Sequence, residues 1–146
     1  MLSKLKVNVA AVSAIAVLAM TSGNALAQKK YDTGASDTEI KIGNIMPYSG
    51  PASAYGVIGK TEQAYFNKIN AEGGINGRKI NFTQLDNAYS APKAVEQSRK
   101  LIEDVGVLAE VGTIGTAPNV AIQKYLNAKQ VPQLFITAGG RRFNDP

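Results

Sequence analysis

The chain has 146 residues with 16 Lys and Arg, 11 Asp and Glu, and neither histidine nor cysteine. Without these two residue types it lacks the commonest general base and the commonest zinc ligands, and it cannot form a disulfide. Its basic residues are scattered or paired and accompany no nucleic-acid reader motif, so we expect a binding protein rather than an enzyme, with no metal, no cofactor and no nucleic-acid partner.

Residues 1–27 have the three regions of a secretory signal peptide. Two lysines precede an apolar run over residues 7–20, and Ala25 and Ala27 place small residues at −3 and −1 of a cleavage site. The run of 14 residues is shorter than the roughly 20 that a membrane-spanning helix needs. We therefore expect cleavage after Ala27 and export to the periplasm. Loss of both lysines lowers the net charge from +5 to +3.

After a polar, flexible lead-in over residues 28–38, apolar residues recur at the spacings of strands and helices in alternation. Ser90 is a plausible helix N-cap with Pro92 in the first turn, and Gly106 is a helix stop. The pattern predicts strands over 39–45, 79–85, 107–111 and 133–136, and helices over 57–71, 90–105 and 117–129.

This order predicts an α/β fold with a doubly wound, mostly parallel sheet. Each helix is long enough to cross over between parallel strands. In such sheets ligands bind beyond the carboxyl ends of the strands. Four loops are expected at that edge, over residues 47–56, 86–90, 112–116 and 137–141.

Four groups of residues form one recognisable pattern along the chain. They are Ser49-Gly50-Pro51 with Tyr55-Gly56, the run Ile-Asn-Ala-Glu-Gly-Gly-Ile-Asn-Gly over 69–77, Asp86-Asn87-Ala88, and Val131-Pro132. In this order and spacing they resemble the periplasmic ligand-binding proteins of branched-chain amino acid ABC transporters. The resemblance implies a two-lobed periplasmic binding protein of type I that closes around a small solute and delivers it to an inner-membrane permease. Because family members are much longer, we expect residues 39–146 to be a partial N-terminal lobe, truncated before the second lobe, from either a truncated gene product or a partial sequence.

The resemblance also implies which residues hold the ligand. Thr116 occupies the place of a hydroxyl residue that binds the ligand's carboxylate at a helix start, where free amides and partial positive charge favour an anion. Capping is the structural alternative for Ser49 and Thr116, and a surface position is the alternative for Tyr55. The full set of implied ligand residues is Ser49, Tyr55, Thr113, Gly115, Thr116, Thr137, Ala138 and Gly139.

Three charged residues need separate interpretations. Arg141 stands where amino-acid binders often have a small or hydroxyl residue, so it is a candidate specificity residue that pairs with a second carboxylate or an aromatic acid, or points to solvent. We expect Asp86, at a strand end, to bind loop amides rather than ligand. Glu110 lies in a strand expected to be buried on both faces, where an unpaired carboxylate is costly, and the sequence gives no account of it.

These observations favour the solute-binding subunit of an ABC importer for branched-chain amino acids or related small carboxylate or amide solutes. Its expected partners are that solute and the permease. A ligand-sensing domain of the same fold in a receptor or regulator is the alternative, and an exported enzyme is disfavoured by the missing histidine and cysteine. Neither the ligand's identity nor the oligomeric state follows from the sequence.

Mass spectrometry of the exported protein should find Gln28 as the first residue, because signal peptidase cleaves after small residues at −3 and −1. An exported chain that retains residues 1–27 would contradict the predicted leader.

Overall fold

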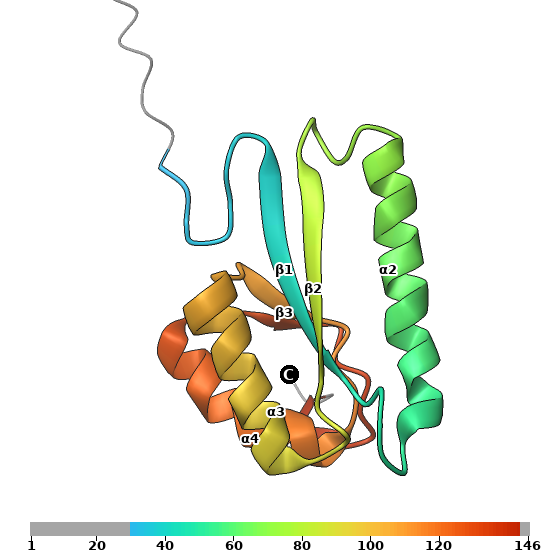
Figure 1. Cartoon of the computed structure of the whole chain (residues 1–146). Helices are drawn as coiled ribbons and strands as arrows, with labels where there is room; N and C mark the ends of the chain where they lie inside the picture. Colours follow the sequence, from blue (N-terminus) through green and yellow to red (C-terminus); the bar gives the residue numbers. More distant parts are fainter. Residues whose placement is uncertain (1–29, 144–146) are drawn as a thin grey trace, which may run out of the picture. The chain divides into compact units, whose positions relative to one another are not determined.

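Four strands form one parallel sheet in the order β2-β1-β3-β4 (Figure 1). Their bounds are β1 Glu39–Met46, β2 Lys79–Asp86, β3 Ala109–Val111 and β4 Gln133–Leu134. The structure is a computed structural model that describes residues 30–143, so the expected signal peptide and its cleavage site lie outside the described residues. The predicted α/β fold with a doubly wound parallel sheet is confirmed.

Three α-helices connect the strands within the described part of the chain. They are α2 (Gly56–Ala71), α3 (Ala91–Arg99) and α4 (Thr116–Lys129). Short turns extend this set: the 3-10 turns η2 (Ser53–Tyr55) and η4 (Arg141–Phe143), and the π-helical turn η3 (Lys100–Val105) that continues α3. Each of β1, β2 and β3 therefore leads into a helix that returns the chain to the next parallel strand, since parallel neighbours need a crossover connection.

The helices cover opposite faces of the sheet, as two neighbouring residues of β1 show. The Asn44 amide donates to Glu62 of α2 at 3.3 Å. The next residue, Ile45, packs instead with Ala94 of α3. Because successive side chains of a strand point to opposite faces, α2 lies on one side of the sheet while α3 packs on the other together with α4 (Figure 1).

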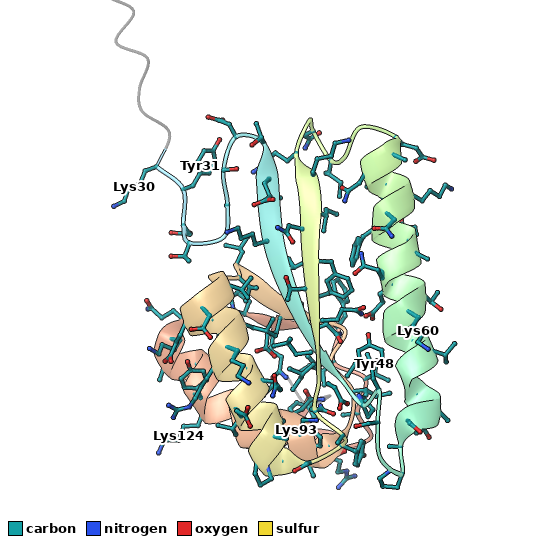
Figure 2. All side chains as sticks on the ribbon, in the orientation of Figure 1. Lys30, Tyr31, Tyr48, Lys60, Lys93 and Lys124 are labelled. Carbon is teal, nitrogen blue, oxygen red and sulfur yellow. The ribbon has the colours of Figure 1, made fainter. Side chains whose placement is uncertain are left out.

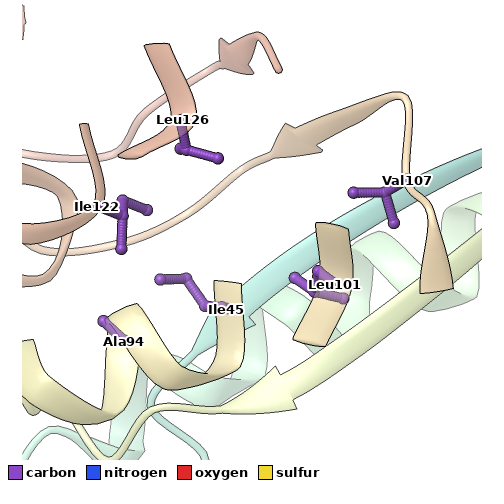
Figure 3. Packing of buried hydrophobic residues seen from close by; sticks show 6 residues of the cluster. All are labelled: Ile45, Ala94, Leu101, Val107, Ile122 and Leu126. Carbon is purple, nitrogen blue, oxygen red and sulfur yellow. The ribbon is translucent and has the colours of Figure 1, made fainter. Parts of the chain in front are cut away.

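The apolar core lies between the sheet and the pair α3 and α4 (Figure 3). Close packing here explains Gly43, since a Cβ at this position would approach Leu101 Cδ1 to 2.9 Å. The core is formed by Ile45, Ala94, Leu101, Val107, Ile122 and Leu126.

The boundaries of α3 follow the predicted signals. The Ser90 hydroxyl accepts from the Lys93 amide at 3.5 Å, and Pro92 stands in the first turn. The helical segment ends at Gly106, which adopts the left-handed conformation with φ 69°. A residue without Cβ takes that conformation at little cost, which is why the segment stops there.

The last predicted strand, over 133–136, is wrong at its end. Pairing stops at Leu134 because Phe135 adopts a left-handed conformation with φ 54°, which is incompatible with a continuous strand. The predicted third strand is also too long at its start, since β3 begins at Ala109 rather than at Val107. The chain after Phe135 returns to the sheet through an isolated parallel bridge between Ile114 and Thr137.

Glu110 of β3 is fully buried on the face covered by α3 and α4. Among the described residues, neither of its carboxyl oxygens has a hydrogen-bond partner, and the buried Ser98 hydroxyl also has none. Burial raises the pKa of Glu110 to about 7, and the nearby Ser98 hydroxyl offsets only part of this shift. A carboxyl group whose pKa is higher in the folded state than in the unfolded state makes its full contribution to stability when the pH is below its unfolded-state pKa of 4.5. That contribution is lost as the pH rises to about 7.

Glu110→Gln should therefore be more stable than the wild type at pH 8, by on the order of 1–3 kcal/mol, since one pKa unit corresponds to ~1.4 kcal/mol. At pH 4 the two proteins should differ little, because the carboxyl group is then largely protonated in both the folded and the unfolded chain. Urea unfolding followed by circular dichroism at both pH values measures the difference. Glu72→Gln, at an exposed position after α2, is the control. An effect of Glu110→Gln that is equal at both pH values would show that Glu110 does not titrate in this range.

Candidate functional site

A pocket of about 340 Å³ lies beyond the carboxyl ends of the strands. Each of the four loops predicted at this edge contributes to it, so segments far apart in the sequence meet at one place. Its lining consists of Tyr55, Tyr89, Ile114, Gly115, Thr116, Thr137, Ala138 and Gly139. The lining side chains include no Asp, Glu, Lys or Arg, so the pocket offers a ligand hydroxyl groups, main-chain groups and aromatic or aliphatic surface.

Six of the eight predicted ligand residues line this pocket, and two do not. The Ser49 hydroxyl donates to Asp86 Oδ2 at 2.6 Å instead. Thr113 is buried, and its hydroxyl accepts from Gln133 Nε2 at 3.1 Å. Arg141 is exposed in η4, just beyond the lining residue Gly139. Ligand contact by any of these residues stays a prediction.

Tyr89 and Ile114 also line the pocket, although the sequence interpretation did not include them. Both fall inside loops that were predicted at the ligand edge, 86–90 and 112–116, and this position is the one signal that could have found them. Their residue types alone do not distinguish pocket-lining side chains from ordinary core or surface side chains.

Helix α4 begins at the pocket wall, where Gly115 and Thr116 line the cavity. No side chain of the described residues caps this helix start, and its first turn has no acidic residue. Pro118 in that turn has no N–H, while the amides of Thr116 and Ala117 precede the first possible intrahelical bond. The helix start therefore presents free donors and partial positive charge toward the cavity.

Two amide side chains, the buried Asn119 and the half-buried Gln133, fix the loop after β3 against α4 and β4. Gln133 Nε2 donates to Thr113 Oγ1 and, at 2.7 Å, to Asn119 Oδ1. Asn119 Nδ2 in turn donates to the Thr113 carbonyl at 3.3 Å. The Thr137 amide donates to that same carbonyl at 2.9 Å, so the loop after β4 is held to the loop after β3.

Asp86, at the end of β2, holds the first two loops together. Its Oδ1 accepts from the amides of Tyr48, Ser49 and Ala88 at 2.9, 3.1 and 3.0 Å. Its Oδ2 accepts from the Ser49 hydroxyl and, at 2.8 Å, from Lys93 Nζ of α3; Figure 2 labels Tyr48 and Lys93. Burial raises the pKa of Asp86, but the donors from Lys93, Ser49 and the loop amides outweigh it and hold the pKa well below its usual range. The predicted role of Asp86 as an acceptor for loop amides is confirmed.

Tyr89 is held over the start of α4 by a strained turn. Ala88 and Tyr89 both adopt left-handed conformations, with φ 49° and 59°, which cost on the order of 1–3 kcal/mol each for residues other than glycine. Asp86 accepts from the Ala88 amide, and Asn87 Oδ1 accepts from the Tyr89 amide at 2.8 Å, which compensates part of that cost. The ring then lies so close to Gly115 that a Cβ there would approach Tyr89 Cε2 to 2.5 Å. Gly115 is thus needed both for its φ of 98° and for the space that the Tyr89 ring occupies.

Comparison with known proteins identifies the family. Residues 39–146 match the family model described as "Periplasmic binding protein". The chain belongs to this family. The pocket described above is therefore the candidate solute site of a periplasmic binding protein.

Relatives and solved structures agree with this assignment and confirm the resemblance to branched-chain amino acid-type binding proteins. The chain is 30% identical over 107 residues to "Leu/Ile/Val-binding protein homolog 3" of Brucella melitensis, covering 73% of this chain and 29% of the relative. It is 30% identical to the branched-chain amino acid transporter substrate binding protein LivJ from Streptococcus pneumoniae, solved with isoleucine, at a TM-score of 0.66 over 70% of this chain and 30% of that one. A fatty acid ABC transporter substrate-binding protein from Thermomonospora curvata is 26% identical, at a TM-score of 0.64 over 70% of this chain and 27% of that chain. The chain therefore spans less than a third of the length of these relatives.

Within residues 30–143 of this periplasmic binding protein, no helix is long and apolar enough to cross a membrane. The same residues contain no group of three or more Asp or Glu side chains placed to hold a metal ion.

Asp86→Asn should destabilise the protein at pH 7 by roughly 1.5–3 kcal/mol, the range for lost hydrogen bonds to a charged group. An acid with a lowered folded-state pKa stabilises the fold above its unfolded pKa of 3.8, and this contribution disappears as the pH falls. The difference between variant and wild type should therefore shrink in acid. Urea unfolding at pH 7 and pH 3 tests this, with Asp104→Asn as the control at an exposed site. A variant as stable as the wild type at pH 7 would show that Asp86 does not hold the loops.

Proposed function

We propose that the complete protein is the periplasmic solute-binding subunit of an ABC importer, with a small carboxylate-bearing solute as ligand and an inner-membrane permease as partner. Branched-chain amino acids and related carboxylate or amide solutes form the candidate class. The observation that carries the proposal is the uncapped start of α4 at the wall of a pocket built by all four loops at the carboxyl edge of the sheet.

The named relatives support the carboxylate as the shared feature. LivJ was solved with isoleucine, and the Thermomonospora curvata protein is named for fatty acids. These compounds differ in their apolar part, and both carry a carboxylate. The pocket combines an anion-favouring helix start with apolar surface from Ile114 and two tyrosine rings, which suits such a molecule.

In this proposal each part of the lining has a separate task. The Thr116 hydroxyl and the free amides of α4 bind the carboxylate, and Thr137 with the main chain of Ala138 and Gly139 binds the remaining polar groups. Tyr55 provides part of the wall. Ser49 acts indirectly, because its hydroxyl and amide are both bound to Asp86. Arg141 is the candidate specificity residue at the end of the fourth loop.

Thr116→Val in the complete exported protein should weaken solute binding by roughly ten- to a hundred-fold. The substitution keeps the shape of the side chain but removes a hydrogen bond to a charged group, which contributes about 1.5–3 kcal/mol. Isothermal titration calorimetry with leucine, isoleucine, valine, benzoate and short fatty acids identifies the solute and measures the loss.

Thr61→Val is the matched control, because Thr61 is exposed on α2 and its hydroxyl binds only within that helix, to the Val57 carbonyl. Unchanged affinity of Thr116→Val with an intact fold would limit Thr116 to a structural role. A folded wild-type protein that binds none of these carboxylates would overturn the proposed function.

A further inference from the structure

The two large side chains with substantial exposure in the pocket are both tyrosines. Tyr55 comes from η2 and Tyr89 from the loop after β2, and they are 54% and 38% exposed. Ile114, the other large side chain in the lining, is only 5% exposed and therefore presents little surface to a solute. The accessible apolar surface that a solute meets here therefore consists chiefly of phenol rings.

Tyr89 differs from a surface tyrosine because its position is fixed from two sides. Its backbone is held in the left-handed conformation by the bond from its amide to Asn87 Oδ1 and by the preceding bond from Ala88 to Asp86. Its ring lies against Gly115, where any side chain would displace it. A ring held in place before binding loses little freedom when a solute packs on it, so its contact contributes fully to affinity.

We infer that Tyr89 is a specificity-determining residue that makes this pocket selective for an aromatic carboxylate over an aliphatic amino acid. An aromatic ring gains offset-stacked or edge-to-face contacts on phenol rings beyond the burial that an aliphatic chain obtains. The inference rests on the proposed solute-binding function and narrows its ligand class.

The test is calorimetry on the complete exported protein with benzoate, 4-hydroxybenzoate and leucine. The wild type should bind at least one of the two aromatic acids about ten-fold or more tightly than leucine. Tyr89→Leu should weaken aromatic binding by roughly two- to ten-fold and leave leucine within about two-fold, since only the aromatic ligand loses ring contacts. Tyr89→Phe keeps the ring and should stay within about two-fold of the wild type for benzoate.

Tyr65→Leu is the matched control, because Tyr65 is exposed on α2 and is not part of the pocket lining. Circular dichroism of each variant verifies the fold. If Tyr89→Leu does not fold, Tyr89→Phe provides the comparison. Unchanged affinity of Tyr89→Phe for benzoate then supports a role of the aromatic ring in binding, and a large loss of affinity contradicts it. A wild type that prefers leucine, or a Tyr89→Leu variant that loses both ligands equally, overturns this inference but leaves the proposed function intact. A folded wild type that binds no carboxylate overturns both.

Discussion

The site depends on one charge, the carboxylate of Asp86 at the end of β2. Main-chain amides of the first and second loops and the ammonium group of Lys93 on α3 all donate to it. These donors come from three segments of the chain, and a neutral side chain would accept fewer and weaker bonds from them. The first loop leads to Tyr55 and the second to Tyr89, so both aromatic walls of the pocket depend on this acceptor. The strained conformations of Ala88 and Tyr89 persist because the bonds from Asp86 and Asn87 determine them.

The two faces of the sheet are stabilised by different means. The face toward α3 and α4 is largely apolar, with Glu110 as a buried exception. The face toward α2 carries a polar layer, in which Asn44 Nδ2 donates to the Val111 carbonyl at 2.6 Å and also to Glu62. Burial raises the pKa of Glu62 to about 7. The carboxyl group of Glu62 lies against Gly112, which begins the third loop and adopts the left-handed conformation with φ 68° that favours glycine.

The sequence was sufficient for the element order, the parallel sheet and the edge at which the loops meet, because these follow from apolar spacing and crossover length. It was also sufficient for Asp86, since an acid at a strand end commonly accepts from loop amides. It could not show that Ser49 and Thr113 are bound to Asp86 and Gln133 and lie outside the described pocket lining, because a hydroxyl can bind a protein group or a ligand and only the three-dimensional neighbours decide. Tyr89 was missed for a related reason: a left-handed tyrosine has no signature in residue spacing, and its contact with Gly115 joins segments 26 residues apart in numbering.

The break at the end of β4 shows how a locally unfavourable conformation helps to form the pocket. Leu134 is 44% and Phe135 81% exposed, which is unfavourable for two large apolar side chains next to each other. If the strand continued, however, the next residues would extend past the sheet edge instead of turning toward α4. The left-handed conformation of Phe135 returns the chain, so that the Thr137 amide donates to the Thr113 carbonyl and the Thr137 carbonyl accepts from the Gly115 amide, both at 2.9 Å. These two bonds place Thr137, Ala138 and Gly139 opposite the start of α4. The exposed ring of Phe135 is therefore a consequence of the same turn that brings the fourth loop to the site.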